Sequence, residues 1–159
     1  MQVLPYNRVV KDFAGKTPEA FLADVKGVAS IAPGSPSPSR KGVASMYVDG
    51  RWYDLGLPKE TNAPLDEALD VSVLQRHILG PLLSVGDPRI DKRIDFVGGI
   101  RGPAELERLV NDGRAAVAFS MFPVSVDDLM AISDAGGIMP PKSTWFEPKL
   151  RDGILVNLI

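Results

Sequence analysis

The sequence contains no cysteine and a single histidine, His77. Without cysteine the chain forms no disulfide bond, no thiolate metal site and no thiol nucleophile. One histidine is too few for a histidine-based zinc site, so no metal is expected. A serine–histidine catalytic pair would have to use this one histidine. The position of His77 beside the apolar stripe of a predicted helix favours a boundary residue over a general base. The sequence therefore names no catalytic residue.

The chain also has no excess of positive charge and no long apolar run. Its 18 Lys and Arg residues and 20 Asp and Glu residues give a net charge of −2. Nucleic-acid binders usually show a basic excess, so no nucleic-acid partner is expected. No stretch approaches the roughly 20 apolar residues of a membrane span, and the first residues lack the pattern of a signal peptide. A cytoplasmic protein without a membrane partner is expected.

What is present is the composition of a globular domain, with 45% hydrophobic and 24% charged residues. A chain of this length buries about 70% of its unfolded surface, which is enough for a substantial core. Residues 1–159 are therefore predicted to form a single domain. The clearest local pattern lies in residues 43–55, where two runs rich in β-formers flank Asp49-Gly50. That pair is typical of the two-residue type I′ turn of a β-hairpin.

The remaining pattern predicts an α+β fold, with a mixed sheet and packed helices. Pro5 places the segment 2–10 at a sheet edge or a strand start, because proline cannot donate to a neighbouring strand. Gly80-Pro81 should kink or end a helix. Val126, Leu129 and Met130 are expected to face inward from a helix. Strands are expected over residues 94–97, 115–121 and 153–159, and helices over residues 17–27, 70–79, 103–113 and 125–136.

The stretch 136–150 has the highest density of unusual residues in the chain. Its three prolines fix backbone angles and hold the segment extended without a helix. Lys142, Ser143 and Thr144 then offer a cation and two hydroxyl groups at adjacent positions, a set suited to gripping a phosphate or carboxylate. Trp145 and Phe146 either wall a pocket or belong to the core.

A second candidate anion-binding segment is the glycine-rich turn at Gly98-Gly99, between a strand and a helix N-terminus. Backbone amides at such a turn attract anions, although neither the dinucleotide-binding nor the P-loop pattern is present. We predict that this turn and the Lys142 segment converge on one cleft, with Arg101 and Lys149 at its mouth. The alternative is a structural ion-pair network in which Asp95 or Glu147 neutralises these cations. The predicted anion-binding residues are Lys142, Ser143, Thr144, Lys149, Gly98, Gly99 and Arg101.

Three segments, 69–74, 91–99 and 139–150, carry a resemblance to a known family. Together with the hairpin, they make the chain similar to the C-terminal half of the bacterial and archaeal domain of unknown function 1015. The resemblance implies a longer protein whose N-terminal half is ParB-like and carries a Gly-His-His-Arg motif. No His-His pair occurs here, so the chain is expected to be the C-terminal domain, with that half as its partner.

Relatives of the ParB-like half include serine kinases, and the family is associated with serine-biosynthesis genes. The resemblance therefore implies the anion- or small-molecule-binding part of a metabolic enzyme, such as a serine or phosphometabolite kinase. In that case the other half supplies the chemistry. The alternative is a non-catalytic ligand-binding or regulatory module. No cofactor is identified, and pairing with a second copy of the chain is left open.

Overall fold

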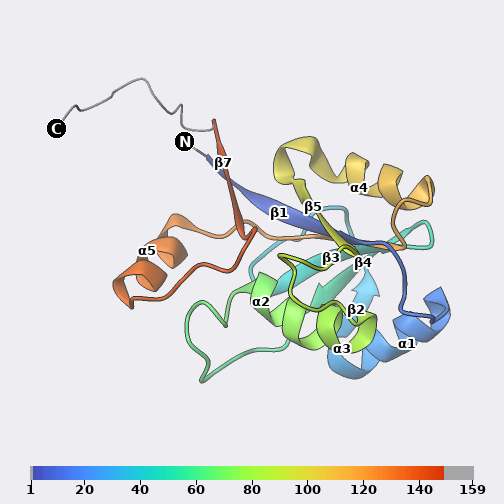
Figure 1. The fold of residues 1–159 in the computed structure, drawn as a ribbon, viewed down its shortest axis with the longest axis horizontal. Helices are drawn as coiled ribbons and strands as arrows, with labels where there is room; N and C mark the ends of the chain where they lie inside the picture. The colour runs from blue at the N-terminus through green and yellow to red at the C-terminus, as the bar shows by residue number, and fades with distance from the viewer. Residues whose placement is uncertain (1, 149–159) are drawn as a thin grey trace.

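The computed structural model describes residues 2–148, and its centre is a seven-stranded sheet (Figure 1). Every strand pairing among these residues is antiparallel, so the expected parallel component of the sheet is absent from the described strands. The α+β class is confirmed. The strands are β1 (Gln2–Val10), β2 (Ser30–Pro33), β3 (Val43–Val48), β4 (Arg51–Gly56), β5 (Ile94–Gly98), β6 (Val117–Ser120) and β7 (Thr144–Glu147).

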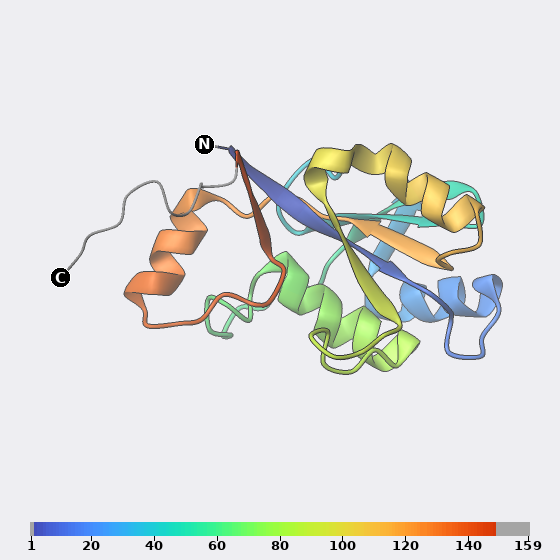
Figure 2. The same cartoon turned by 45° about the horizontal axis from the view of Figure 1, so that its top comes forward.

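Helices cover both faces of the sheet. α4 lies on one face, and α1 and the continuous α2–η1–α3 segment lie on the other, while α5 projects beside β7 (Figures 1 and 2). No described helix is long and apolar enough to cross a membrane. The helices are α1 (Pro18–Val28), α2 (Asp70–Leu74), the π-helix η1 (Gln75–Leu79), α3 (Gly80–Leu83), the 3-10 helix η2 (Gly99–Arg101), α4 (Gly102–Asn111) and α5 (Val126–Asp134).

Strand β1 lies inside the sheet, so of the two alternatives predicted from Pro5, a sheet edge or a strand start, the edge is wrong. The strand order is β2-β4-β3-β6-β1-β5, and β7 pairs with the first half of β1. The second half, Arg8 to Val10, bonds to β5 on one side and to β6 on the other. Pro5 lies in the first half, opposite Thr144 of β7. It is tolerated because it lies outside the part of β1 that both β5 and β6 flank.

The predicted hairpin is confirmed. β3 and β4 pair from Val48↔Arg51 outward, and Asp49 and Gly50 have φ angles of 49° and 74°. Both central residues with positive φ define the type I′ turn, whose twist matches that of the flanking strands. Tyr47 and Trp52 lie opposite each other, with ring centroids 5.0 Å apart.

Gly50→Val is expected to lower the free energy of unfolding by about 1–3 kcal/mol, because a β-branched residue at positive φ is strained. Denaturant unfolding of the two proteins measures the difference. Asp49→Asn is the matched control, since asparagine accepts the left-handed conformation and should leave stability nearly unchanged. Equal stability of Gly50→Val and the wild type would contradict the turn assignment.

The helix predicted over residues 70–79 does not end at Gly80-Pro81. It continues to Leu83 through the π-helical segment η1, in which the Gly80 amide donates to the Gln75 carbonyl. The wider π turn lets the chain pass the position where Pro81 offers no amide hydrogen. Similarly, α1 continues past Gly27 to Val28. The helix starts predicted at Thr17 and Ser125 are confirmed, because each side chain accepts a hydrogen bond from a backbone amide of the first turn. α2, in contrast, starts without a side-chain cap.

Of the three side chains of α5 that were predicted to face inward, Leu129 packs against the core and the other two do not. Val126 and Met130 are 54% and 58% exposed, and Ile132 is the buried side chain of this helix. Because α5 projects away from the sheet (Figure 2), it contacts the core over a narrower stripe than a helix lying across a sheet. The final strand predicted over residues 153–159 lies outside the described residues.

The core has one cluster on each side of the sheet. The larger cluster packs α1 and the α2–η1–α3 segment against the sheet, with Phe21, Leu79 and Leu83 fully buried. The smaller cluster lies under α4 and is built around Leu106, which is also fully buried. α4 is therefore held on its face by a separate set of contacts, and these contacts fix the residues that α4 contributes to the site below.

Candidate functional site

Three distant segments meet at one pocket of about 410 Å³, here called the Lys142 pocket. β1 contributes Tyr6, the end of β5 and the following α4 contribute one wall, and the chain leading into β7 contributes the other. The pocket is lined by Tyr6, Asp95, Phe96, Val97, Gly98, Arg101, Glu105, Arg108, Leu109, Arg114, Lys142 and Trp145.

A tight turn positions Lys142. Its φ of 55° is unusual for a residue other than glycine, and it follows Pro141 directly. The Ser143 hydroxyl donates to the Pro140 carbonyl at 2.8 Å, and the Arg8 guanidinium donates to the Lys142 carbonyl at 3.1 Å. These bonds offset the backbone strain, which costs about 1–3 kcal/mol at such a residue. The ammonium group of Lys142 lies 5.4 Å from the centre of the Tyr6 ring.

Gly98, which ends β5, and Gly99, which begins η2, both lie too close to neighbouring atoms for a larger side chain. A Cβ on Gly98 would lie 2.6 Å from the Trp145 ring, so the indole lies directly on the Gly98 backbone. A Cβ on Gly99 would lie 2.7 Å from the Pro5 carbonyl oxygen. Neither glycine has a positive φ. Close approach to β7 and β1, rather than a tight turn, therefore explains both residues.

The Lys142 pocket contains more cations than carboxylates. Arg101, Arg108, Arg114 and Lys142 line it, against Asp95 and Glu105. The Glu105 carboxylate forms ion pairs with two of these arginines: its Oε1 lies 2.8 Å from Nη2 of Arg108 and 3.6 Å from Nη1 of Arg101. Hydrogen bonds from Arg108 lower the pKa of Glu105, so this carboxylate stays ionised and is a poor general base.

Two of the cations lack a carboxylate partner within the described part of the chain. Neither Arg114 nor Lys142 has an Asp or Glu oxygen within 4.0 Å among residues 2–148. Glu147 accepts a hydrogen bond from the Trp145 indole at 2.9 Å, and Asp95 accepts one from the Phe96 amide. A structural ion-pair network therefore explains the positions of Arg101 and Arg108, which pair with Glu105. It does not explain Arg114 and Lys142, whose charges have no carboxylate partner among residues 2–148.

The structure brings together three of the predicted anion-binding residues: Gly98, Arg101 and Lys142 line the same pocket. Gly99 packs against Pro5 instead. Ser143 is 4% exposed and its hydroxyl is committed to the turn.

Two further predicted residues differ in their placement. Thr144 belongs to β7, where it pairs with Pro5 and does not line the Lys142 pocket. Lys149 lies outside the described residues. Of the two neighbouring aromatics, Trp145 lines the pocket and Phe146 does not.

Sequence reasoning missed Tyr6, Arg108 and Arg114. Arg108 had a detectable signal, because it is a cation on the helix predicted directly after the glycine-rich turn and Arg101. Tyr6 and Arg114 had none, since they reach the pocket only through the pairing of β1 with β5 and the turn that follows α4.

His77 lies elsewhere, on η1, where its Nε2 is 2.7 Å from Glu60. Hydrogen bonding from His77 lowers the pKa of Glu60. No cluster of three His, Asp or Glu side chains suited to a metal ion occurs in residues 2–148.

Comparison with known proteins gives a family and a distant structure. The model of the family described as "Protein of unknown function (DUF1015)" matches residues 1–72. No curated protein matches the chain. Among solved structures, the chain is similar to a mutant free serine kinase in complex with AMP, with 12% identity and a TM-score of 0.49. That alignment covers 91% of this chain and 53% of the kinase chain, so this chain spans about half the length of that protein.

The family match confirms the resemblance inferred from the sequence and places it in the first part of the chain. It includes the hairpin and ends at Ser72, within α2. The glycine-rich turn and the Lys142 segment, which carried much of the resemblance, lie beyond the matched residues.

Proposed function

We propose that this chain, whose residues 1–72 match the model of the family described as "Protein of unknown function (DUF1015)", binds a small anionic metabolite in the Lys142 pocket. The observation that carries the proposal is the convergence of four cations from separate segments on one pocket. Like charges held near one another repel unless an anion lies between them. The pocket size of about 410 Å³ is within the range of small-molecule sites.

A phosphate group fits this pocket well. Arg114 and Lys142 supply two positive charges that no described carboxylate neutralises, which matches the charge of a phosphate monoester near neutral pH. Arg101 is 68% exposed and its contact with Glu105 is long, so it is free to turn toward a ligand. The Trp145 and Tyr6 rings give the pocket an aromatic wall for the rest of the metabolite.

We further propose that this chain is the anion-binding part of a metabolic enzyme, and that this enzyme is a serine or phosphometabolite kinase. This finer proposal rests on the resemblance to the family and on the phosphate-like charge of the pocket. Glu105 is a weak base, because the hydrogen bond from Arg108 lowers its pKa. The N-terminal half that the resemblance implies would therefore supply the reacting groups. A cytoplasmic location and a single domain over residues 1–159 are part of the same proposal.

Lys142→Ala is expected to weaken the binding of inorganic phosphate about tenfold or more, because a hydrogen bond to a charged group is worth about 1.5–3 kcal/mol. Isothermal titration calorimetry measures the affinity. The wild-type affinity should also fall as sodium chloride is raised, since the pocket is open to solvent.

Lys92→Ala is the matched control. Lys92 is an exposed cation in the turn that precedes β5, whereas Gly98 ends that strand, so the length of β5, about 13 Å of extended chain, lies between the two. Its removal changes the net charge equally but should leave phosphate affinity unchanged. If both variants bind phosphate alike, the Lys142 pocket is not the anion site.

A turnover assay distinguishes part of a kinase from a non-catalytic binding module. Free serine and a nucleotide are supplied to the protein with its N-terminal half, and phosphoserine is measured. Nucleotide-dependent turnover that is lost in Lys142→Ala supports the enzyme. Phosphate binding without nucleotide consumption supports a non-catalytic ligand-binding or regulatory module.

A further inference from the structure

A second pocket, which shares no lining residue with the Lys142 pocket, contains a buried cation without a counterion. Arg8 is 4% exposed in the central strand β1. No carboxylate oxygen among residues 2–148 lies within 4.0 Å of its guanidinium. Burial lowers the pKa of Arg8 to about 10, which still leaves the group charged at neutral pH. A buried charge of this kind is costly unless a partner compensates it.

The contacts that Arg8 makes within the protein stabilise its buried charge only in part. Its guanidinium donates to the carbonyl groups of Tyr6 and Lys142, and it lies 5.4 Å from the centre of the Phe96 ring. These two bonds use two of the five N–H donors of an arginine. Carbonyl dipoles and an aromatic face stabilise the charge but do not neutralise it.

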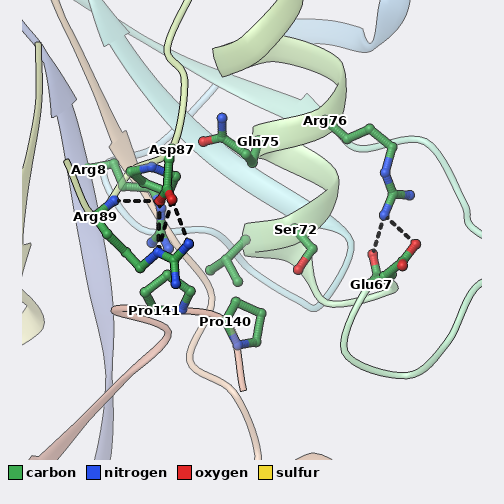
Figure 3. A pocket seen from close by; sticks show the side chains of 11 residues that line it. Arg8, Glu67, Ser72, Gln75, Arg76, Asp87, Arg89, Pro140 and Pro141 are labelled. Atoms are coloured by element: carbon green, nitrogen blue, oxygen red, sulfur yellow. Dashed lines mark hydrogen bonds and ion pairs between the residues drawn. The ribbon is translucent and has the colours of Figure 1, made fainter. Parts of the chain in front are cut away.

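Arg8 lines a pocket of about 460 Å³, here called the Arg8 pocket. Figure 3 shows Arg8 and Arg89 on one side, Ser72 and Gln75 on the helix on the other, and Pro140 and Pro141 between them. Pro140 and Pro141 precede Lys142, so the same turn that places Lys142 in the first pocket walls the second. The π-helical segment η1 begins at Gln75, and such segments frequently occur at functional sites.

The other charges of the Arg8 pocket neutralise one another. Arg89 forms a two-pronged pair with Asp87, with Nε–Oδ1 and Nη2–Oδ2 distances of 2.9 and 2.6 Å. Arg76 pairs with Glu67 at 3.0 Å, away from Arg8 in the view of Figure 3. One positive charge, that of Arg8, is left over. A ligand with a single negative charge balances it, whereas a dianion would exceed it.

The walls indicate what such a ligand carries besides its charge. Val71, Pro88, Pro140 and Pro141 give apolar surface, and sites of this kind use a few polar groups to orient a mainly apolar ligand. The planar carboxylate matches the remaining fork of guanidinium donors. We propose that the Arg8 pocket binds a small monocarboxylate with a short apolar body, and that Arg8 holds its carboxylate group.

The test titrates butyrate and the uncharged butyramide into the full chain and follows the backbone amide signals by NMR. Butyrate is expected to shift the signals of Ser72, Gln75 and Arg89 and to bind at least tenfold more tightly than butyramide. It should also bind more tightly than acetate, because its longer apolar body covers the proline wall. Arg8→Gln removes the charge but keeps amide donors, and it should lose the preference for butyrate over butyramide.

Three results would overturn the proposal. One is equal binding of butyrate and butyramide by the wild-type chain, a comparison that stands even if Arg8→Gln does not fold. Another is a set of butyrate shifts confined to the Lys142 pocket, at Gly98, Arg101 and Trp145. The third is displacement of butyrate from Ser72 and Gln75 by an equal concentration of inorganic phosphate, which would show a site for dianions.

Discussion

Leu106→Ala is expected to lower the free energy of unfolding by about 2–5 kcal/mol and to weaken phosphate binding in the molecules that remain folded. Leu106 is fully buried and is the centre of the contacts that hold α4 on the sheet. Glu105 and Arg108 reach the Lys142 pocket from the same helix, and Arg101 directly precedes it. A cavity under α4 therefore loosens one wall of the pocket. Denaturant unfolding and phosphate titration at low temperature measure the two effects.

Leu83→Ala separates general destabilisation from loss of the pocket. Leu83 is also fully buried, but it ends α3 on the opposite face of the sheet (Figure 1). The two variants should lose similar stability, and only Leu106→Ala should lose phosphate affinity. Unchanged affinity in Leu106→Ala would mean that α4 does not form part of the anion site.

Gly98→Ala is expected to cost about 1–3 kcal/mol, the usual range for overpacking a close contact. The added Cβ would lie 2.6 Å from the Trp145 ring, a distance that requires the indole to move. The indole has little freedom to do so, because it donates to Glu147 at 2.9 Å and its ring centre lies 5.3 Å from that of Tyr6. The displaced indole should change its fluorescence, measured with Trp52 replaced by phenylalanine.

Gly27→Ala provides a matched glycine control. Gly27 lies within α1, has no atom within 4 Å of an added Cβ and does not have a positive φ. Alanine there should raise stability by about 0.5–1 kcal/mol, because it favours the helix and restricts the unfolded chain. If Gly98→Ala also proved neutral or stabilising, the close packing of Trp145 on the β5 backbone would be wrong.

The elements predicted correctly depend on interactions between near neighbours in the chain. Asp49-Gly50 determines its turn because both residues accept positive φ and the flanking strands pair directly across it. Thr17 and Ser125 cap their helices through hydrogen bonds to amides three residues later. These signals lie within a few residues, so a single sequence contains them in full.

The incorrect predictions concern segments whose structure is determined by contacts with residues distant in the sequence. Pro5 indicated a sheet edge or a strand start, but β1 changes neighbours along its length, and the proline falls where only β7 is paired. Gly80-Pro81 indicated a kink or an end of the helix, and the end is wrong, because the packing of Leu79 and Leu83 in the core stabilises a π turn that carries the helix past the proline. Val126 and Met130 followed a helical apolar stripe, but α5 has less core to cover than the pattern assumed.

The candidate sites show the same division. The sequence by itself determined the α+β class, the hairpin and the helix starts at Thr17 and Ser125, because composition and short-range geometry determine these. Only the tertiary structure decided that Arg114 and Tyr6 join that segment, that Gly98 makes room for Trp145, and that Arg8 is buried without a carboxylate partner among the described residues. Arg8 and Lys142 are 134 residues apart and are joined by one hydrogen bond. Contacts over such separations are set by strand order and register, which no local pattern in one sequence specifies.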